Sequence, residues 1–277
     1  MPDSTHLTVG GADVVLRDSG GEGPLVLLIH GWCADGVLNF APVFEPLEQA
    51  GYRAVSLDLP GCGATKDNQR FSLGRCAEVA GMILEEMTDE PAIIVGFSMG
   101  GAVAQLLARS HPELVQGLVF VATAAHLASH QFSRSEVNAV SHLFDLPASI
   151  ADKVSSLPLL SGRGDGEHGG MSAHMSWWLR RGHLRDSLEA GRELSCFDSS
   201  LWVGSLGIPS VSVITTGDHL VGLSAQRELA ALSGAGSIEV DAGHLLVTEE
   251  RFGGILVEAT QQLSDVCESG ADSRSYD

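Results

Sequence analysis

Short aliphatic runs alternate with helical patterns along most of this 277-residue chain, which limits the folds open to it. The runs are apolar at consecutive positions, as is typical of parallel strands buried on both faces. They cover residues 25–29, 54–57, 92–95, 118–121, 211–214 and 238–240. The helical patterns lie near residues 37–50, 72–88, 99–110, 222–232 and 249–266. This alternation predicts an α/β fold with a mostly parallel sheet and helices on both faces.

Two further segments modify this pattern. Short strand-like pieces around Gly10-Gly11 predict a hairpin near the start of the chain. No aliphatic strand run occurs between about residues 125 and 204, so we expect a mostly helical insertion there, with a flexible loop at 161–172. The expected division is a core, an insertion and a flexible tail, at 1–124 with 205–267, at 125–204 and at 268–277 respectively.

The composition argues against two classes of partner. Asp and Glu number 35 and Lys and Arg number 16, so the formal net charge is −19. That charge repels nucleic acid phosphates and anionic lipid head groups, so we expect neither nucleic acid nor a membrane as a partner. No apolar run approaches the roughly 18 residues that a membrane span needs.

The cysteines and the first residues bear on the compartment. The five cysteines are scattered and form no CxxC pair, which favours reduced thiols over a disulfide framework or a zinc site. The chain starts without the basic and apolar regions of a signal peptide. We therefore expect a cytoplasmic protein without a metal. No glycine-rich phosphate-binding motif follows a strand, so no nucleotide cofactor is expected.

The segment Gly96-Phe97-Ser98-Met99-Gly100 is a GxSxG motif between a strand run and a helical pattern. A serine attacks well when a sharp turn lifts its hydroxyl clear of the sheet, and such a turn brings the neighbouring backbone close. The two glycines supply the lack of bulk that this turn requires. Ser98 is therefore the candidate nucleophile, although an ordinary turn of small residues would show the same pattern.

A serine nucleophile needs a base and an orienting acid, which follow this motif in the order Ser, Asp or Glu, His. Both are expected beyond the carboxyl ends of parallel strands. Asp218 and His244 each follow a strand run, whereas His219 is the chain neighbour of Asp218 and cannot readily fold back onto it. We predict His244 as the base and Asp218 as its acid. Asp241, three residues before His244, stays an alternative acid.

The loop after the first parallel strand is expected to complete an oxyanion hole. The residues His30-Gly31-Trp32 directly follow that strand run. In this layout one backbone amide comes from the loop and the other from the residue after the nucleophile. We predict the N–H groups of Trp32 and Met99 as the donors. We expect His30 to hold the loop through hydrogen bonds.

Together these segments resemble the α/β-hydrolase superfamily. The matching motifs occur in the family order at 30–32, 58–63, 96–101, 215–221 and 242–245. The resemblance implies an eight-stranded, mostly parallel sheet with a helical cap inserted after the sixth strand. It maps the family's Ser-His-Asp triad onto Ser98, His244 and Asp218.

The chain departs from the family pattern near the acid and the base. Thr215 stands where a glycine is common, three positions before the acid. Neither Val221-Gly222-Leu223 nor Glu249-Glu250-Arg251 contains the proline that is common in those loops.

The resemblance implies a cofactor-free serine hydrolase that cleaves a carboxylic ester or thioester through an acyl-enzyme. The same triad would serve an acyltransferase, a lactonase or a cyclase if another acceptor replaced water, and a non-catalytic small-molecule receptor is a third alternative. Cys33, Trp177, Trp178 and Leu245 are candidates for lining a pocket for a small, apolar acyl substrate. A paired Trp in a lid or a buried cysteine is also common in simple packing. The sequence leaves the oligomeric state open.

Overall fold

The computed structural model describes residues 1–126 and 184–272. Its strands are β1 (Ser4–Val9), β2 (Ala12–Asp18), β3 (Leu25–Ile29), β4 (Arg53–Leu57), β5 (Ala92–Phe97), β6 (Val115–Val121), β7 (Ser210–Thr215) and β8 (Gly236–Val240). Its α-helices are α1 (Gly36–Phe40), α2 (Phe44–Gln49), α3 (Leu73–Met87), α4 (Met99–Ser110), α8 (Leu184–Cys196), α9 (Leu223–Ser233) and α10 (Phe252–Asp272). Short 3-10 helices are η1 (Ala41–Val43), η2 (Pro112–Leu114), η3 (Val203–Ser205) and η4 (His244–Thr248).

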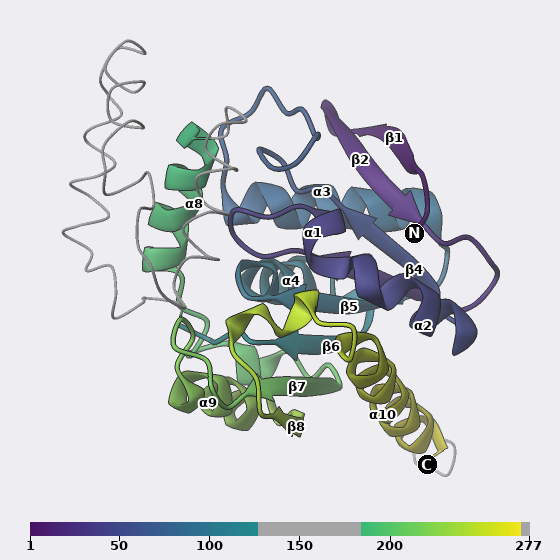
Figure 1. The fold of residues 1–277 in the computed structure, drawn as a ribbon, viewed down its shortest axis with the longest axis vertical. Helices are drawn as coiled ribbons and strands as arrows, with labels where there is room; N and C mark the ends of the chain where they lie inside the picture. The colour runs from purple at the N-terminus through teal and green to yellow at the C-terminus, as the bar shows by residue number, and fades with distance from the viewer. Residues whose placement is uncertain (127–183, 273–277) are drawn as a thin grey trace.

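The eight strands form one sheet in the order β1-β2-β4-β3-β5-β6-β7-β8 (Figure 1). β1 and β2 form the expected hairpin, and β2 also pairs antiparallel with β4. The other neighbouring strands are parallel. The prediction of an α/β fold with a mostly parallel sheet is thus confirmed. In such a sheet the loops that follow β3, β5, β7 and β8 all emerge at one edge.

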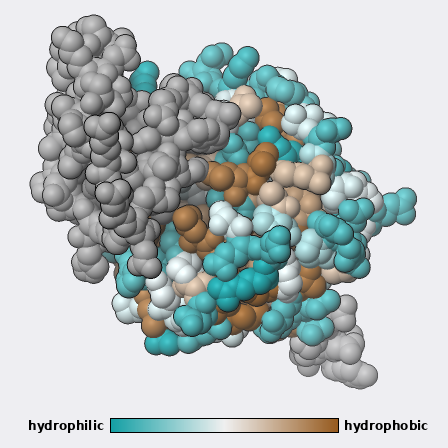
Figure 2. Space-filling model, viewed as in Figure 1, coloured by the Kyte–Doolittle hydropathy of each residue, from teal (hydrophilic) through white to brown (hydrophobic). Residues whose placement is uncertain are grey.

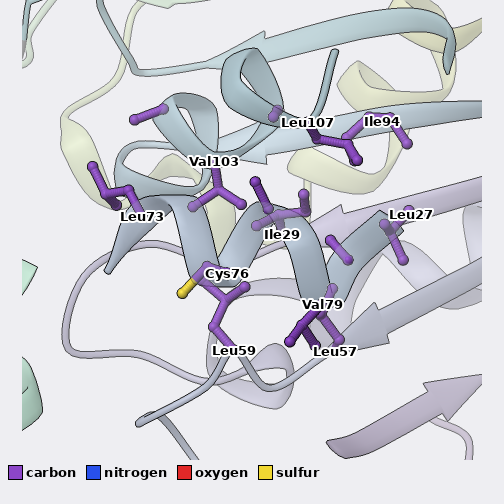
Figure 3. Packing of buried hydrophobic residues seen from close by; sticks show 14 of the residues in the cluster. Leu27, Ile29, Leu57, Leu59, Leu73, Cys76, Val79, Ile94, Val103 and Leu107 are labelled. Atoms are coloured by element: carbon purple, nitrogen blue, oxygen red, sulfur yellow. The ribbon is translucent and has the colours of Figure 1, made fainter. Parts of the chain in front are cut away.

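Apolar clusters cover both faces of the sheet. Alternate residues of β3 divide between them: Leu27 and Ile29 join one cluster, and Val26 and Leu28 the other. Side chains of α3 and α4 complete the first cluster, as Figure 3 shows for Leu73, Cys76, Val79, Val103 and Leu107. Side chains of α1, α2 and α10 complete the second. Burial on both faces explains why the strand runs carry no polar alternation.

The segment expected as one helix over 37–50 is divided into α1, η1 and α2. Pro42 lies in the first turn of η1 and Pro46 in the first turn of α2. Proline lacks the backbone N–H of an internal helical bond and is tolerated in a first turn. The two prolines therefore restart the helix instead of continuing it.

The end of the chain also differs from the expectation of a flexible tail over 268–277. Helix α10 continues to Asp272, so the first half of that segment is helical. Once a helix is nucleated by packed residues such as Leu256 and Leu263, each further residue adds one hydrogen bond, and no proline interrupts this one.

Most of the expected insertion, including the loop at 161–172, lies outside the described residues. Its last helix, α8, lies beside α3 (Figure 1). The two ends of the insertion meet. The Ser199 N–H donates to the Ala125 carbonyl (2.9 Å), and the Ser199 hydroxyl donates to Oε1 of Gln105 on α4 (2.5 Å). His126 and Asp198 form an isolated antiparallel bridge at the same point.

Figure 2 shows mainly hydrophilic side chains on the described surface of one face, with apolar ones gathered toward its middle. Within residues 1–126 and 184–272, no helix combines the length and the hydropathy that a bilayer-spanning segment requires.

Candidate active site

Ser98 occupies the sharp turn between β5 and α4. Its backbone angles are φ 52° and ψ −114°, a conformation that residues other than glycine rarely adopt. Three hydrogen bonds hold the turn. The Ser98 N–H donates to the Val121 carbonyl (2.9 Å), and the Ser98 carbonyl accepts from the Gly101 N–H (2.9 Å) and from the Thr123 hydroxyl (2.8 Å). The serine side chain is left partly exposed at the end of the strand.

The glycines around Ser98 permit this turn. A Cβ on Gly100 would overlap the Ile29 carbonyl oxygen, and a Cβ on Gly96 would collide with the Gly100 carbonyl oxygen. The start of α4 therefore lies directly against the end of β3. The lack of bulk that the GxSxG pattern predicted is thus present at both glycines.

His244 begins η4 after β8 and lies next to Ser98. Its Nε2 lies 3.0 Å from the Ser98 hydroxyl oxygen, and its Nδ1 lies 2.7 Å from Oδ2 of Asp218. An ionised carboxylate only accepts, so the proton is assigned to Nδ1, and Nε2 is left to accept from the serine hydroxyl. The Phe97 ring packs against the imidazole, with ring centroids 5.0 Å apart. The three residues selected from the sequence are therefore joined in one hydrogen-bonded chain.

Asp218 follows β7, and its side chain is fully buried. The N–H groups of Leu220 (2.8 Å) and Val221 (3.0 Å) donate to Oδ1, and His244 donates to Oδ2. Burial by itself would raise the pKa of the Asp218 carboxyl. The hydrogen bond from His244, the attraction of its ring when the ring is protonated, and the two backbone amides outweigh burial and lower this pKa below its ordinary value.

The side chains of Asp241, the alternative acid, and of His219, the chain neighbour of Asp218, form no hydrogen bond with the triad in the described part of the chain. Asp241 is exposed, and its carbonyl accepts a hydrogen bond from Arg251 (3.0 Å). His219 is also exposed. Within the described residues it is therefore Asp218, and not Asp241, that contacts His244.

Two residues beside Asp218 were not selected from the sequence. Thr215 and Gln226 are buried, and both lie within hydrogen-bond distance of Oδ2 of Asp218 (3.0 and 3.3 Å). The sequence contains one indication of the role of Thr215, because this residue stands where a glycine is common in the family. Gln226 had none, because a glutamine on an amphipathic helix ordinarily faces solvent.

The loop at the end of β3 is held by His30. The ring donates from Nδ1 to the Gly31 carbonyl (2.8 Å), and Nε2 accepts from the Leu59 N–H (3.0 Å). Burial lowers the pKa of His30 more than the nearby Asp58 charge raises it, which favours a neutral ring. Both ring nitrogens are occupied by backbone groups, so His30 offers no free nitrogen to a substrate.

Two backbone amides are expected to bind an oxyanion, those of Trp32 and Met99. Among the described residues, none accepts a hydrogen bond from the N–H of Trp32 or of Met99. The Gly31 N–H, by contrast, donates to the side chain of Asn39 (2.9 Å).

The Trp32 side chain joins this loop to α8. Its Nε1–H donates to the Ser187 carbonyl (2.7 Å), and its ring fills the space above Gly191, where a Cβ would come within 2.9 Å of the ring. The position of α8 and the position of the Trp32 amide are therefore mechanically linked.

The four pocket candidates have different surroundings. Cys33 is buried with φ 54° in the apolar cluster beside α3, and burial raises the pKa of its thiol to about 12. Leu245 follows His244 and is 41% exposed. Trp177 and Trp178 lie outside the described residues.

Residues 1–126 and 184–272 contain no group of three His, Cys, Asp or Glu side chains suited to a metal ion.

Comparison with known proteins points to one family. A family model described as the alpha/beta hydrolase fold matches residues 24–155. The chain is 35% identical over 130 residues to a pimeloyl-acyl-carrier-protein methyl ester esterase of Chromobacterium violaceum, which covers 45% of this chain and 49% of that protein. It is 32% identical over 168 residues to the magnesium-chelatase 30 kDa subunit of Rhodobacter capsulatus, covering 52% and 58% respectively. The chain thus spans about half the length of these curated relatives.

Solved structures show the same fold over nearly the whole chain. A hydrolase from Pseudomonas aeruginosa superposes with a TM-score of 0.73 at 21% identity, covering 94% of this chain and 98% of that one. The enol-lactonase from Burkholderia xenovorans also gives a TM-score of 0.73, at 18% identity, covering 94% and 100%. Together with the eight-stranded sheet and the family model, these matches show that the chain has the alpha/beta hydrolase fold.

Proposed function

We propose that this protein is a serine hydrolase that cleaves a carboxylic ester or thioester through an acyl-enzyme, without a cofactor. The observation that carries the proposal is the hydrogen-bonded chain from Ser98 through His244 to the buried Asp218. A serine hydroxyl with a neutral imidazole at hydrogen-bond distance, itself oriented by a carboxylate, is the arrangement that makes the oxygen nucleophilic near neutral pH.

In the first half of the reaction, Ser98 Oγ attacks the substrate carbonyl carbon while its proton passes to Nε2 of His244. Asp218 stabilises the resulting imidazolium and stays ionised. The amides of Trp32 and Met99 donate to the oxyanion of the tetrahedral intermediate. The bond to the leaving group then breaks, and His244 returns its proton to the leaving oxygen or sulfur.

In the second half, water replaces the leaving group. His244 accepts a proton from the water, the hydroxide attacks the acyl carbon, and a second tetrahedral intermediate forms in the same oxyanion hole. Its collapse releases the carboxylic acid and returns the proton to Ser98. Every proton therefore moves through Nε2 of His244, which explains the need for a fixed tautomer.

Residues 125–204 form the cap in this proposal, and Cys33, Trp177, Trp178 and Leu245 lie along the pocket for a small, apolar acyl substrate. The linkage between Trp32 and α8 supports this division, since it joins the described end of the insertion to the oxyanion loop. The named esterase activity of the Chromobacterium violaceum relative supports the ester class of substrate.

Turnover of p-nitrophenyl esters of increasing acyl length tests the proposal. We expect Ser98→Ala to lower kcat by at least about a thousandfold and to abolish labelling by a fluorophosphonate. Ser110→Ala is a matched control, because Ser110 is exposed at the other end of the same helix, and it should retain wild-type turnover. Undiminished turnover in Ser98→Ala contradicts the proposal.

Product analysis separates hydrolysis from the alternatives. We expect the free acid as the product even when alcohols or amines are added. Esters or amides of those acceptors would indicate an acyltransferase, and a cyclic product would indicate a cyclase. Tight binding without turnover would indicate a receptor.

A further inference from the structure

The side chain of Asp218 contacts a polar network that the proposed reaction does not use. Thr215 is the last residue of β7, and Gln226 lies eleven residues later on α9. Thr215 is fully buried and Gln226 is 2% exposed, so water cannot substitute for the bonds that these side chains make.

The directions of these hydrogen bonds follow from their donors and acceptors. Gln226 Oε1 accepts from the Thr215 N–H (2.9 Å), which places the Gln226 amide nitrogen on the opposite side. That nitrogen donates one proton to the Val221 carbonyl (2.7 Å) and the other to the Thr215 hydroxyl oxygen (3.0 Å). The Thr215 hydroxyl then keeps its own proton for Oδ2 of Asp218 (3.0 Å).

This set satisfies each polar group in the network. The longer contacts, from Gln226 Nε2 to Asp218 Oδ2 and from Thr215 Oγ1 to Gln226 Oε1, are both 3.3 Å and compete for the same protons. Oδ2 of Asp218 therefore receives two bonds, one from Thr215 and one from His244, while Oδ1 receives two backbone amides.

We propose that Thr215 and Gln226 are positioning residues, which fix the carboxylate plane of Asp218 so that Oδ2 meets Nδ1 of His244. This inference rests on the proposed function. Without the Thr215 hydroxyl, only His244 and the longer contact from Gln226 Nε2 (3.3 Å) would remain at Oδ2, so the carboxylate would lose its shorter bond on the side facing α9. Gln226 acts one step further away, because it holds the Thr215 hydroxyl in the orientation that points its proton at Asp218.

The chain's departure from the pattern of the family that it resembles supports this assignment. A glycine is common at the position of Thr215, and a glycine has no hydroxyl to donate. Thr215 therefore gives Asp218 a contact that the common residue could not supply, and Gln226 gives that hydroxyl its own partner.

Thr215→Val tests the assignment with little change in shape, because it replaces the hydroxyl by a methyl group. We expect kcat for a p-nitrophenyl ester to fall about tenfold, in line with the loss of one hydrogen bond to a charged group, with KM changed less than twofold. Thr215→Ser keeps the hydroxyl and should restore kcat to within twofold of wild type. Thr260→Val makes the same change at a buried threonine in α10, whose hydroxyl bonds only within its own helix, and should leave kcat unaltered.

Gln226→Met tests the second step. We expect kcat to fall in this variant too, and the double variant with Thr215→Val to be no slower than the slower single variant, because Gln226 acts through Thr215. Fully additive losses would show that Gln226 acts independently and would overturn its assignment.

A proton NMR signal gives a readout that does not depend on turnover. The Nδ1 proton shared by His244 and Asp218 should resonate far downfield and disappear in His244→Gln. We expect this signal to shift or broaden in Thr215→Val and to match wild type in Thr215→Ser and Thr260→Val. If wild type hydrolyses no ester, the proposed function fails while the signal still reports on positioning. Unchanged kcat and an unchanged signal in Thr215→Val would overturn the inference.

Discussion

The nucleophile and its acid are positioned by different physical means. At the turn after β5, the backbone does the positioning: Ser98 has a positive φ, and the glycines on either side let α4 approach β3. At the loop after β7, side chains complete the positioning: two backbone amides hold Oδ1 of Asp218, while Oδ2 meets the hydroxyl of Thr215, the amide of Gln226 and the imidazole of His244.

This difference implies different tolerance to substitution. A backbone turn without spare volume fails when one carbon is added, because the surrounding sheet cannot move. A side-chain network loses one hydrogen bond at a time and leaves the fold intact. Substitutions at the two loops should therefore differ in kind, with loss of folding at the first and loss of catalytic rate at the second.

The largest effect is expected at Gly100. Gly100→Ala places a Cβ on the Ile29 carbonyl, at the end of the central strand β3, and should lower the free energy of unfolding by about 3 kcal/mol. Chemical denaturation measures this loss. Gly254→Ala in α10 is the matched control, because nothing lies within 4 Å of its added carbon, and it should be neutral or stabilising by up to about 1 kcal/mol. Equal stabilities of the two variants would remove the contrast between the two loops.

The next effect is expected at the acid. Asp218→Asn keeps the size of the side chain but replaces an oxygen that accepts from His244, and it should lower kcat by roughly a thousandfold to ten-thousandfold without loss of the fold. Steady-state kinetics on an ester and circular dichroism measure the two properties. Asp241→Asn changes the exposed alternative acid and should leave kcat unchanged; a large loss there would reassign the acid.

A smaller effect is expected at the link between the oxyanion loop and α8. Trp32→Phe removes the Nε1–H donor to Ser187 and should lower the free energy of unfolding by about 1 kcal/mol and kcat several-fold. Trp202→Phe removes a longer bond (3.2 Å) and serves as the control, with an expected loss below about 0.5 kcal/mol. If Trp32→Phe alters neither property, the link does not position the loop.

The smallest effect concerns acid stability. The folded state lowers the pKa of Asp218 below its ordinary value of 3.8, so its ionised form stabilises the fold above that value. This contribution is lost as the pH falls through the lowered pKa. The difference in unfolding free energy between wild type and Asp218→Asn should therefore narrow between pH 5 and pH 3. A difference that does not change with pH would show that the charge of Asp218 adds nothing to stability.

The same contrast explains what could be predicted from the sequence. The strand runs and the GxSxG glycines reflect local constraints on burial and backbone conformation, and such constraints appear in consecutive residues. Asp218 and His244 could be selected because strand ends of a parallel sheet meet at one edge. Gln226 could not, since its role depends on how α9 packs against β7.

Other differences have local causes of their own. The helix expected over 37–50 is restarted at Pro42 and Pro46, which a pattern of apolar spacing alone does not register. The end of α10 was expected to fray because its residues are small and polar, but the helix continues from its packed portion. The contact between Trp32 and α8 joins residues far apart in the chain, and no local pattern reports it.

The junction at Ala125 and Ser199 has a consequence for how specificity can change. Because Gln105 and Ser199 close the loop at its base, the chain between the two ends can lengthen, shorten or be exchanged while the sheet stays in register. Segments of different origin could be grafted between these two residues onto an unaltered sheet and triad. A graft that keeps α8, and with it the bond from Trp32 to Ser187, would change the substrate range without changing the triad or the oxyanion loop.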